Sequence, residues 1–127
     1  MKLSKNFNKR EFNSKDGKRM PLHVLKNIKI LAVQVQIIRD ALAAPIHINS
    51  GYRSPEHNKR IGGVKNSQHV QGKAADLASR DCTSLNLYNL ILQLINEGKI
   101  INGGLGIYNG FVHYDIRSTS ARWDYRK

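Results

Sequence analysis

The sequence is poor in cysteine and proline and contains no long apolar segment. Its single cysteine, Cys82, excludes an intramolecular disulfide and a zinc site built from four cysteines. Charged or amide side chains interrupt every apolar run, so no stretch reaches the roughly 18–20 residues that span a bilayer. With 40% hydrophobic residues and three prolines, the composition is that of a globular protein and excludes a collagen-like or disordered chain.

Acidic residues are also scarce. Twenty-one Lys and Arg residues against nine Asp and Glu residues give a net charge of +12, and nine of these basic residues fall within residues 1–29. Such a surface attracts anionic partners: nucleic acid, anionic lipid or phosphate-bearing cell-wall polymers. No RNA-recognition signature, zinc finger or aromatic-interleaved basic stripe accompanies the charge, so we expect no dedicated nucleic-acid site. A solvated basic surface is the simplest interpretation.

The length suits one compact domain over residues 1–127, large enough to fold without a metal or a disulfide. The first ten residues are polar and basic, and no apolar segment follows them, so we expect no secretory signal. The chain would then remain in the cytosol on synthesis. The residues do not fix the oligomeric state, and we expect a monomer.

Apolar spacing predicts two main helices. From Pro21 onward, apolar residues recur at spacings of three and four, which predicts a helix over 21–43. Thr83 or Ser84 caps a second amphipathic helix, which Gly98 ends.

Short β-prone segments predict a small sheet. The expected strands are 46–49, 74–77, 105–108 and 111–116, the last two joined by Asn109-Gly110, a strong hairpin signal. Residues 50–73 are rich in Ser, Gly, Asn and Lys and lack helical periodicity, so we expect a long ordered loop, which in a compact domain is usually functional. The expected fold class is α+β, with a small antiparallel sheet packed against the two main helices.

Side chains alternate along the last expected strand. One face carries Val112, Tyr114 and Ile116, and the other carries Phe111, His113, Asp115 and Arg117. An apolar face opposite one with His, Asp and Arg is typical of a sheet with the core on one side and an active site on the other.

Three polar residues form a candidate metal site. His69 and Asp76 are seven residues apart with Gly72 between them, and His113 lies on another expected strand. Two imidazoles and one carboxylate suit Zn²⁺, and three protein ligands leave one position for water, as in catalytic zinc sites. Mn²⁺ or Co²⁺ would tolerate the same ligands. From spacing alone, a structural role for each residue remains open.

Ordered motifs over most of the chain resemble a known family. The motifs are Ser50-Gly51-Tyr52-Arg53-Ser54-Pro55, Asn58 with Ile61-Gly62-Gly63, Ser67-Gln68-His69 with Gly72, Ala74 and Asp76, and Phe111-Val112-His113 with Asp115 and Arg117. Together they closely resemble the zinc D-Ala-D-Ala carboxypeptidase family of peptidoglycan peptidases. That group also includes phage murein endopeptidases, vancomycin-resistance D,D-dipeptidases and, more distantly, the zinc-binding hedgehog signalling domain. The resemblance runs from Phe7 to Trp123.

The resemblance implies a zinc site carried by the sheet. It implies that His69, Asp76 and His113 bind zinc and that Arg53 holds a substrate carboxylate or carbonyl beside the metal. Ser67 is similar to a family serine near the first ligand, and we expect it to support the site and contact substrate.

The general base is the weakest part of the match. Many members of the family carry an acid three residues before the last zinc histidine, but here that position is Gly110. Alternation places Asp115 beside His113, so we expect Asp115 to take a proton from the zinc-bound water and pass it to the leaving amine. The alternative is that Asp115 orients a ligand or pairs with Arg117.

Other aromatic, histidine and thiol side chains receive weaker predictions. Tyr108 is expected to line the substrate cleft; Tyr52 and Trp123 fit the cleft or the core equally well. Cys82 is expected to be a small buried residue, and His57 a loop or surface residue.

The sequence therefore predicts a zinc metallopeptidase acting on peptidoglycan stem peptides. It would be a D,D-carboxypeptidase or a murein endopeptidase, and a basic chain without a signal peptide suits a phage-type endolysin that reaches the wall through a lesion made by another protein. Its positive surface would attract cell-wall or outer-membrane phosphates. One alternative, favoured by Gly110, is a catalytically silent zinc-containing wall-binding module. Another is nucleic-acid binding through the basic N-terminal third.

Overall fold

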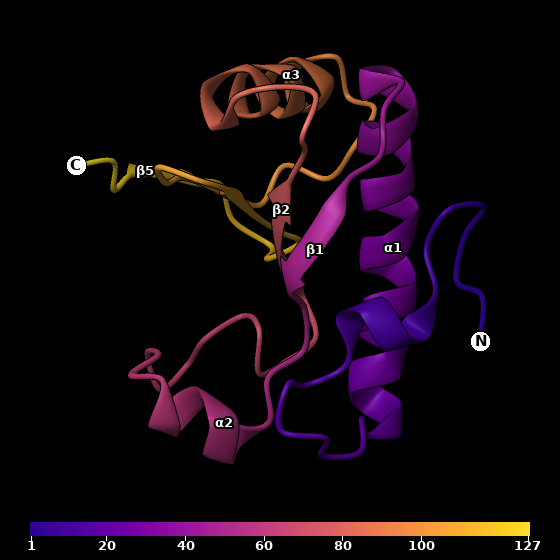
Figure 1. The fold of residues 1–127 in the computed structure, drawn as a ribbon, viewed down its shortest axis with the longest axis vertical. Helices are drawn as coiled ribbons and strands as arrows, with labels where there is room; N and C mark the ends of the chain where they lie inside the picture. Colours follow the sequence, from indigo (N-terminus) through magenta and orange to yellow (C-terminus); the bar gives the residue numbers. More distant parts are fainter.

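A five-stranded sheet organises the chain, and the computed structural model describes all residues from 1 to 127 (Figure 1). The strands are β1 (His47–Ser50), β2 (Ala74–Ala78), β3 (Gly104–Ile107), β4 (Val112–Asp115) and β5 (Ala121–Asp124). Their order in the sheet is β1-β2-β4-β3-β5. All neighbouring pairs are antiparallel except β3 and β5, which run parallel. The expected α+β class is confirmed, and the parallel pairing through β5 is an addition that the sequence did not predict.

Two helices pack with one face of this sheet to form the core. They are α1 (Leu22–Leu42) and α3 (Ser84–Asn96). The buried side of α1 repeats at helical spacing, and it joins Leu77, Val112 and Tyr114 from the sheet in a single apolar cluster. Thr83 caps α3 by accepting a hydrogen bond from the backbone N–H of Asn86 (3.1 Å). Both predicted helices are confirmed, and so is the apolar face of β4.

The segment expected to be one long loop contains a helix, α2 (Pro55–Arg60). Ser54 accepts a hydrogen bond from the N–H of His57 (3.1 Å), and Pro55 occupies the first turn, where its missing N–H is tolerated. Asn58 is the one buried residue of α2, so the helix has no apolar stripe. For this reason, apolar periodicity could not reveal it.

The N-terminal segment forms hydrogen bonds with residues 52–54, which follow β1. A short 3₁₀ helix, η1 (Lys9–Phe12), ends in a fully buried phenylalanine whose carbonyl accepts a hydrogen bond from the N–H of Tyr52 (2.8 Å). The N–H of Ser54 donates to the hydroxyl of Ser14 (3.0 Å). Tyr52 is thereby buried in the core and not in a cleft.

None of the helices combines the length and apolar character needed to cross a membrane.

Candidate metal centre and cleft

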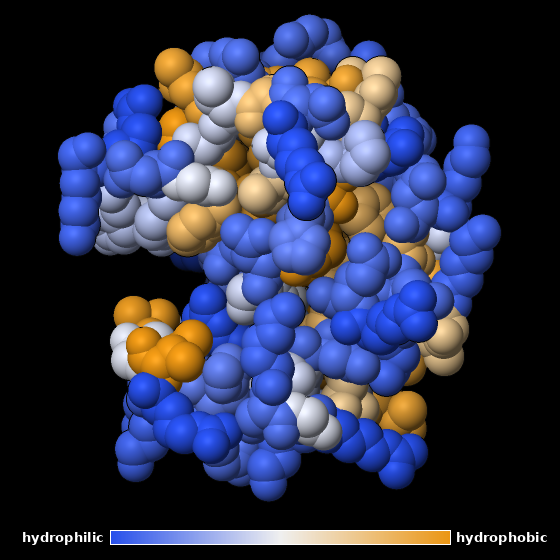
Figure 2. Space-filling view, viewed as in Figure 1, coloured by the Kyte–Doolittle hydropathy of each residue, from blue (hydrophilic) through white to orange (hydrophobic).

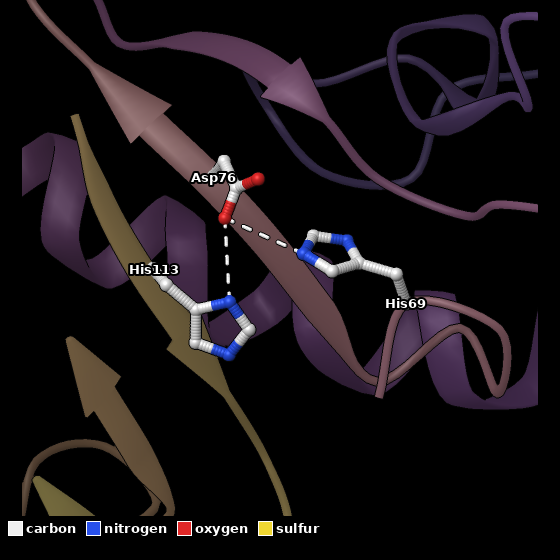
Figure 3. Close-up of side chains that lie close together, drawn as sticks. All are labelled: His69, Asp76 and His113. Carbon is white, nitrogen blue, oxygen red and sulfur yellow. Dashed lines mark ion pairs between the residues drawn. The ribbon is translucent and has the colours of Figure 1, made fainter. Parts of the chain in front are cut away.

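His69, Asp76 and His113 converge on the face of the sheet opposite the apolar core (Figure 3). Asp76 on β2 and His113 on β4 are direct antiparallel partners, so their side chains leave the sheet on the same face. Nε2 of His69 lies 3.4 Å and Nδ1 of His113 lies 3.3 Å from Oδ1 of Asp76. The three potential ligand atoms lie within 4.8 Å of one another, and all three residues are buried.

A tight turn brings His69 to the strands. The hydroxyl of Ser67 accepts a hydrogen bond from the N–H of His69 (3.1 Å), and the N–H of Gly72 donates to the His69 carbonyl (3.2 Å). Gly72 has a φ of +73°, and a Cβ there would lie 2.6 Å from a methyl carbon of Val24 on α1. Ser67 thus supports the turn that carries His69, and it also lines the neighbouring cleft.

Each imidazole is oriented by a hydrogen bond on its outer side. Nδ1–H of His69 donates to the carbonyl of Gly51 (2.8 Å), and Nε2–H of His113 donates to the carboxylate of Asp115 (2.7 Å). These bonds fix the tautomers so that the remaining nitrogen of each ring presents a lone pair toward the common centre. The donor set therefore fits a zinc ion, which prefers neutral imidazole and carboxylate ligands with such outer partners.

The charges around the centre favour a bound cation. Burial alone would raise the pKa of Asp76, but its interactions with His113 and His69 outweigh burial and hold the pKa well below its usual range. Burial alone would lower the pKa of His113, but its hydrogen bonds with Asp115 and Asp76 raise it. Two buried carboxylates at one imidazole thus stabilise positive charge at this point.

Asp115 lies behind His113 and does not reach the cleft. Its side chain is 0% exposed, and besides His113 it accepts hydrogen bonds from the N–H of Gly104 (2.8 Å) and from Arg117. Both oxygens are occupied, so the expected proton shuttle has no free acceptor facing substrate. The geometry matches the alternative, in which Asp115 orients a ligand and pairs with Arg117. Alternation along β4 predicted the correct face but not the depth of this side chain.

Arg53 lies at the edge of the centre, close to Asp76. Its Nη2 is 3.5 Å from Oδ2 of Asp76, and its Nε donates to the hydroxyl of Ser50 (3.1 Å). Asn58 from α2 lies 3.4 Å from Nη1 of Arg53 and also donates to the carbonyl of Val64 (2.8 Å). Arg53 is therefore held by β1, β2 and α2 together, and Asn58 was missed as a positioning residue because α2 was not predicted.

An open cleft of about 520 Å³ lies over the centre. Figure 2 shows a deep hollow in the side of the molecule between the region of α2 and the upper body, where β5 and α3 lie in Figure 1. Its lining includes the three ligand candidates, Arg53, Ser67 and, on the far side, Tyr108, Phe111, Arg117, Trp123 and Tyr125. Tyr108, expected to line a substrate cleft, lines this one, and its contact with substrate stays a prediction.

The far wall of the cleft is aromatic and depends on β5. The rings of Tyr108 and Phe111 stack with centroids 4.4 Å apart, and Tyr125 meets Tyr108 edge-on at 5.6 Å. The indole N–H of Trp123 donates to the hydroxyl of Tyr108 (3.0 Å), and its ring centroid lies 5.0 Å from that of His113. From the sequence alone, Trp123 fits the cleft or the core equally well; the structure places it in the cleft wall, against the ligand candidate His113.

The remaining singled-out residues lie elsewhere. His57 is half-buried in α2 and does not line the cleft. Cys82 is half-buried at the edge of the core, where burial raises the pKa of its thiol, so it is less enclosed than expected.

Comparison with known proteins gives a consistent match. A family model described as peptidase M15 matches residues 5–115, which is most of the chain. The zinc D-Ala-D-Ala carboxypeptidase of Streptomyces albus G is 39% identical over 54 residues. That alignment covers 42% of this chain and 21% of the Streptomyces protein, so the chain matches about a fifth of that relative's length.

Proposed function

The chain belongs to the peptidase M15 family, and on that premise we propose that it is a zinc-dependent peptidase that hydrolyses peptide bonds in peptidoglycan stem peptides. The observation that carries the proposal is the convergence of His69, Asp76 and His113 at the floor of an open cleft, with both imidazoles oriented from outside. Three protein ligands at a cleft are typical of catalytic zinc, whereas structural zinc sites have four.

The metal and the cleft residues would have different roles in the hydrolysis. When bound, zinc supplies a Lewis acid that polarises the scissile carbonyl and lowers the pKa of water. Arg53 is permanently charged and lies in the cleft beside Asp76, so it binds a substrate carboxylate or carbonyl there and stabilises developing negative charge. Asp115 holds His113 in the tautomer that faces the centre.

Mass spectrometry of digested peptidoglycan tests this proposal. Purified wall material would be treated with zinc-loaded protein, with chelated protein and His113→Ala as controls. Loss of one D-Ala establishes a D,D-carboxypeptidase, and new termini within stems or cross-bridges establish an endopeptidase. In either case both controls must be inactive.

A second candidate is a zinc-containing wall-binding module without hydrolysis. It is favoured by one observation: Asp76 is the sole carboxylate that lines the cleft, because Gly110 stands where many relatives carry an acid and Asp115 is enclosed. Stoichiometric zinc binding with no cleavage in any wall type would establish this candidate and overturn the peptidase.

A finer form of the proposal is a phage-type endolysin that is made in the cytosol and acts on the wall. It is supported by the net charge of +12, which attracts phosphate-bearing wall or outer-membrane polymers. The test is the turbidity of cells whose outer membrane has been permeabilised. Lysis that slows with rising salt supports this form, whereas trimming of stems without lysis indicates a maintenance peptidase.

A further inference from the structure

A second arginine lines the cleft on the side of the centre away from Arg53. Arg53 contacts Asp76 on β2, whereas Arg117 follows β4 and pairs with Asp115. In the sheet order β1-β2-β4-β3-β5, the two guanidinium groups therefore flank the centre, one toward β1 and the other toward β5. Both side chains line the same cleft.

The guanidinium of Arg117 contacts Asp115 through its edge and the indole of Trp123 through its face. Its Nε lies 2.9 Å from Oδ1 and its Nη2 lies 2.7 Å from Oδ2 of Asp115, a two-point pairing. Its central carbon lies 5.4 Å from the ring centroid of Trp123, an arrangement that favours a cation over the indole. The remaining nitrogen, Nη1, makes no hydrogen bond within the protein, and the side chain is 29% exposed.

The glycines of β3 leave room for this arrangement. A Cβ on Gly104 would lie 2.2 Å from Oδ2 of Asp115 and 2.8 Å from Nε of Arg117. A Cβ on Gly106 would lie 2.1 Å from Nε1 of Trp123. At these two glycines the backbone of β3 thus approaches the Asp115–Arg117 pair and the indole more closely than a residue with a Cβ would permit. The guanidinium is therefore held in place before a ligand arrives. Such preorganisation reduces the entropy lost on binding.

We propose that Nη1 of Arg117 binds a carboxylate of the substrate on the side of the scissile bond opposite the group bound by Arg53. The inference rests on the proposed peptidase function and narrows its substrate to peptides with a free carboxylate on the Arg117 side of the cleaved bond. An acidic residue whose side-chain carboxyl group forms the peptide bond keeps its α-carboxylate free, and such a residue would supply this group. Amidation of that carboxylate would then weaken recognition.

The test compares two synthetic stem peptides that differ at one group, a carboxylate in one and a carboxamide in the other. Binding is measured by stopped-flow emission of Trp123, the sole tryptophan, before turnover, and hydrolysis by kcat/KM. Because a charged hydrogen bond is at stake, we expect zinc-loaded wild type to bind the carboxylate peptide about tenfold more tightly. Arg117→Gln should abolish this preference, and Arg117→Lys should retain part of it.

Arg126→Gln is the matched control, because Arg126 lies outside the cleft and pairs with exposed Asp124. It should keep the wild-type preference. If Arg117→Gln weakens both peptides equally, or if wild type does not discriminate between them, the proposal is overturned and Arg117 serves Asp115 alone. If Arg117→Gln does not fold, absence of a preference in wild type still overturns the proposal, and a preference that Arg117→Lys keeps in full would assign the carboxylate to another residue. A preference in binding without hydrolysis of either peptide would retain the anion site and reject the peptidase.

Discussion

Two carboxylates with different surroundings define the metal centre at the scale of single residues. Asp76 faces both imidazoles and the cleft, whereas Asp115 is enclosed by His113, Arg117 and the backbone of Gly104. The first is placed to bind a metal, and the second to orient one of its ligands. The two roles are separable by mutation.

We expect Asp115→Asn to weaken zinc binding by about 10–100-fold, the usual cost of losing an outer partner of a histidine ligand. The amide removes the negative charge that accepts from both His113 and Arg117. Competition with a chromogenic chelator measures the affinity. Asp124→Asn removes an equal charge from an exposed pair with Arg126 and should bind zinc as wild type does. Unchanged affinity in Asp115→Asn together with lost hydrolysis would instead support a proton-transfer role.

Asp16 gives the fold a sensitivity to acid that is distant from the metal centre. Burial alone would raise its pKa, but hydrogen bonds from the hydroxyls of Ser54 and Ser14 and the N–H of Lys18 hold the pKa well below its usual range. A carboxylate with a lowered pKa stabilises the folded state above about pH 4, and this contribution is lost as the pH falls toward the folded-state pKa.

We therefore expect Asp16→Asn to have a lower Tm than wild type at neutral pH. The difference should shrink as the pH falls from about 5 to 3, because the Asp16 carboxylate of the unfolded chain becomes protonated there while that of the folded protein stays ionised. Thermal unfolding followed by circular dichroism across this range provides the measurement. Asp81→Asn, at an exposed loop position, is the control. A gap in Tm that stays constant with pH would show that the charge of Asp16 contributes nothing.

At the scale of elements, what the sequence predicted depends on how each element is stabilised. The helices α1 and α3 and the hairpin of β3 and β4 have apolar patterns or turn residues that are visible locally. By contrast, α2 is held by hydrogen bonds of Ser54 and Asn58, and β5 by the packing of Trp123 over Gly106. The contact of Trp123 with Gly106 joins residues far apart in sequence, so no local pattern indicates β5. The contacts of α2 are local, but its one buried residue is Asn58, so apolar periodicity does not indicate this helix.

The packing of β5 on β3 leads to a prediction at Gly106. We expect Gly106→Ala to destabilise the fold by about 1–3 kcal/mol, the usual cost of overpacking, because its Cβ would overlap the indole of Trp123. Urea unfolding gives the stability, and the emission maximum of Trp123 should shift as the ring becomes exposed. Gly110→Ala is the matched control, since a Cβ there meets nothing within 4 Å. Equal stability of the two variants would show that Trp123 does not pack as described.

Two adjacent residues of α1 test its orientation against the sheet. Leu31 is fully buried, whereas Ile30 is 47% exposed on the outer face. We expect Leu31→Ala to cost about 2–5 kcal/mol and Ile30→Ala about 0.5 kcal/mol or less. Denaturant unfolding of both variants measures the difference. Comparable losses would mean that the helix is rotated from the position described here.

At the scale of the whole molecule, the apolar core and the polar centre occupy opposite faces of one sheet. Leu77 and Val112 point into the core, while Asp76 and His113, their neighbours along β2 and β4, point into the cleft. Alternation along β4 is a period that the sequence displays, which is why the core face of that strand and the opposite face with His113 were both predicted. The depth of Asp115 and the aromatic wall depend on β5, whose position only the folded chain reveals.

This separation predicts how metal removal affects stability. The core includes residues from both main helices and the sheet and involves no ligand candidate, so the chelated protein should stay folded. A zinc ion held by the three candidates would join β2, β4 and the turn at His69. A ligand that binds only the folded state raises the free energy of unfolding by about 2.7 kcal/mol when its free concentration is a hundred times its Kd. We expect Tm to rise with added zinc in wild type and to remain constant in His113→Ala. Circular dichroism melts with buffered zinc measure both, and unfolding on chelation at room temperature would show that the core does not suffice.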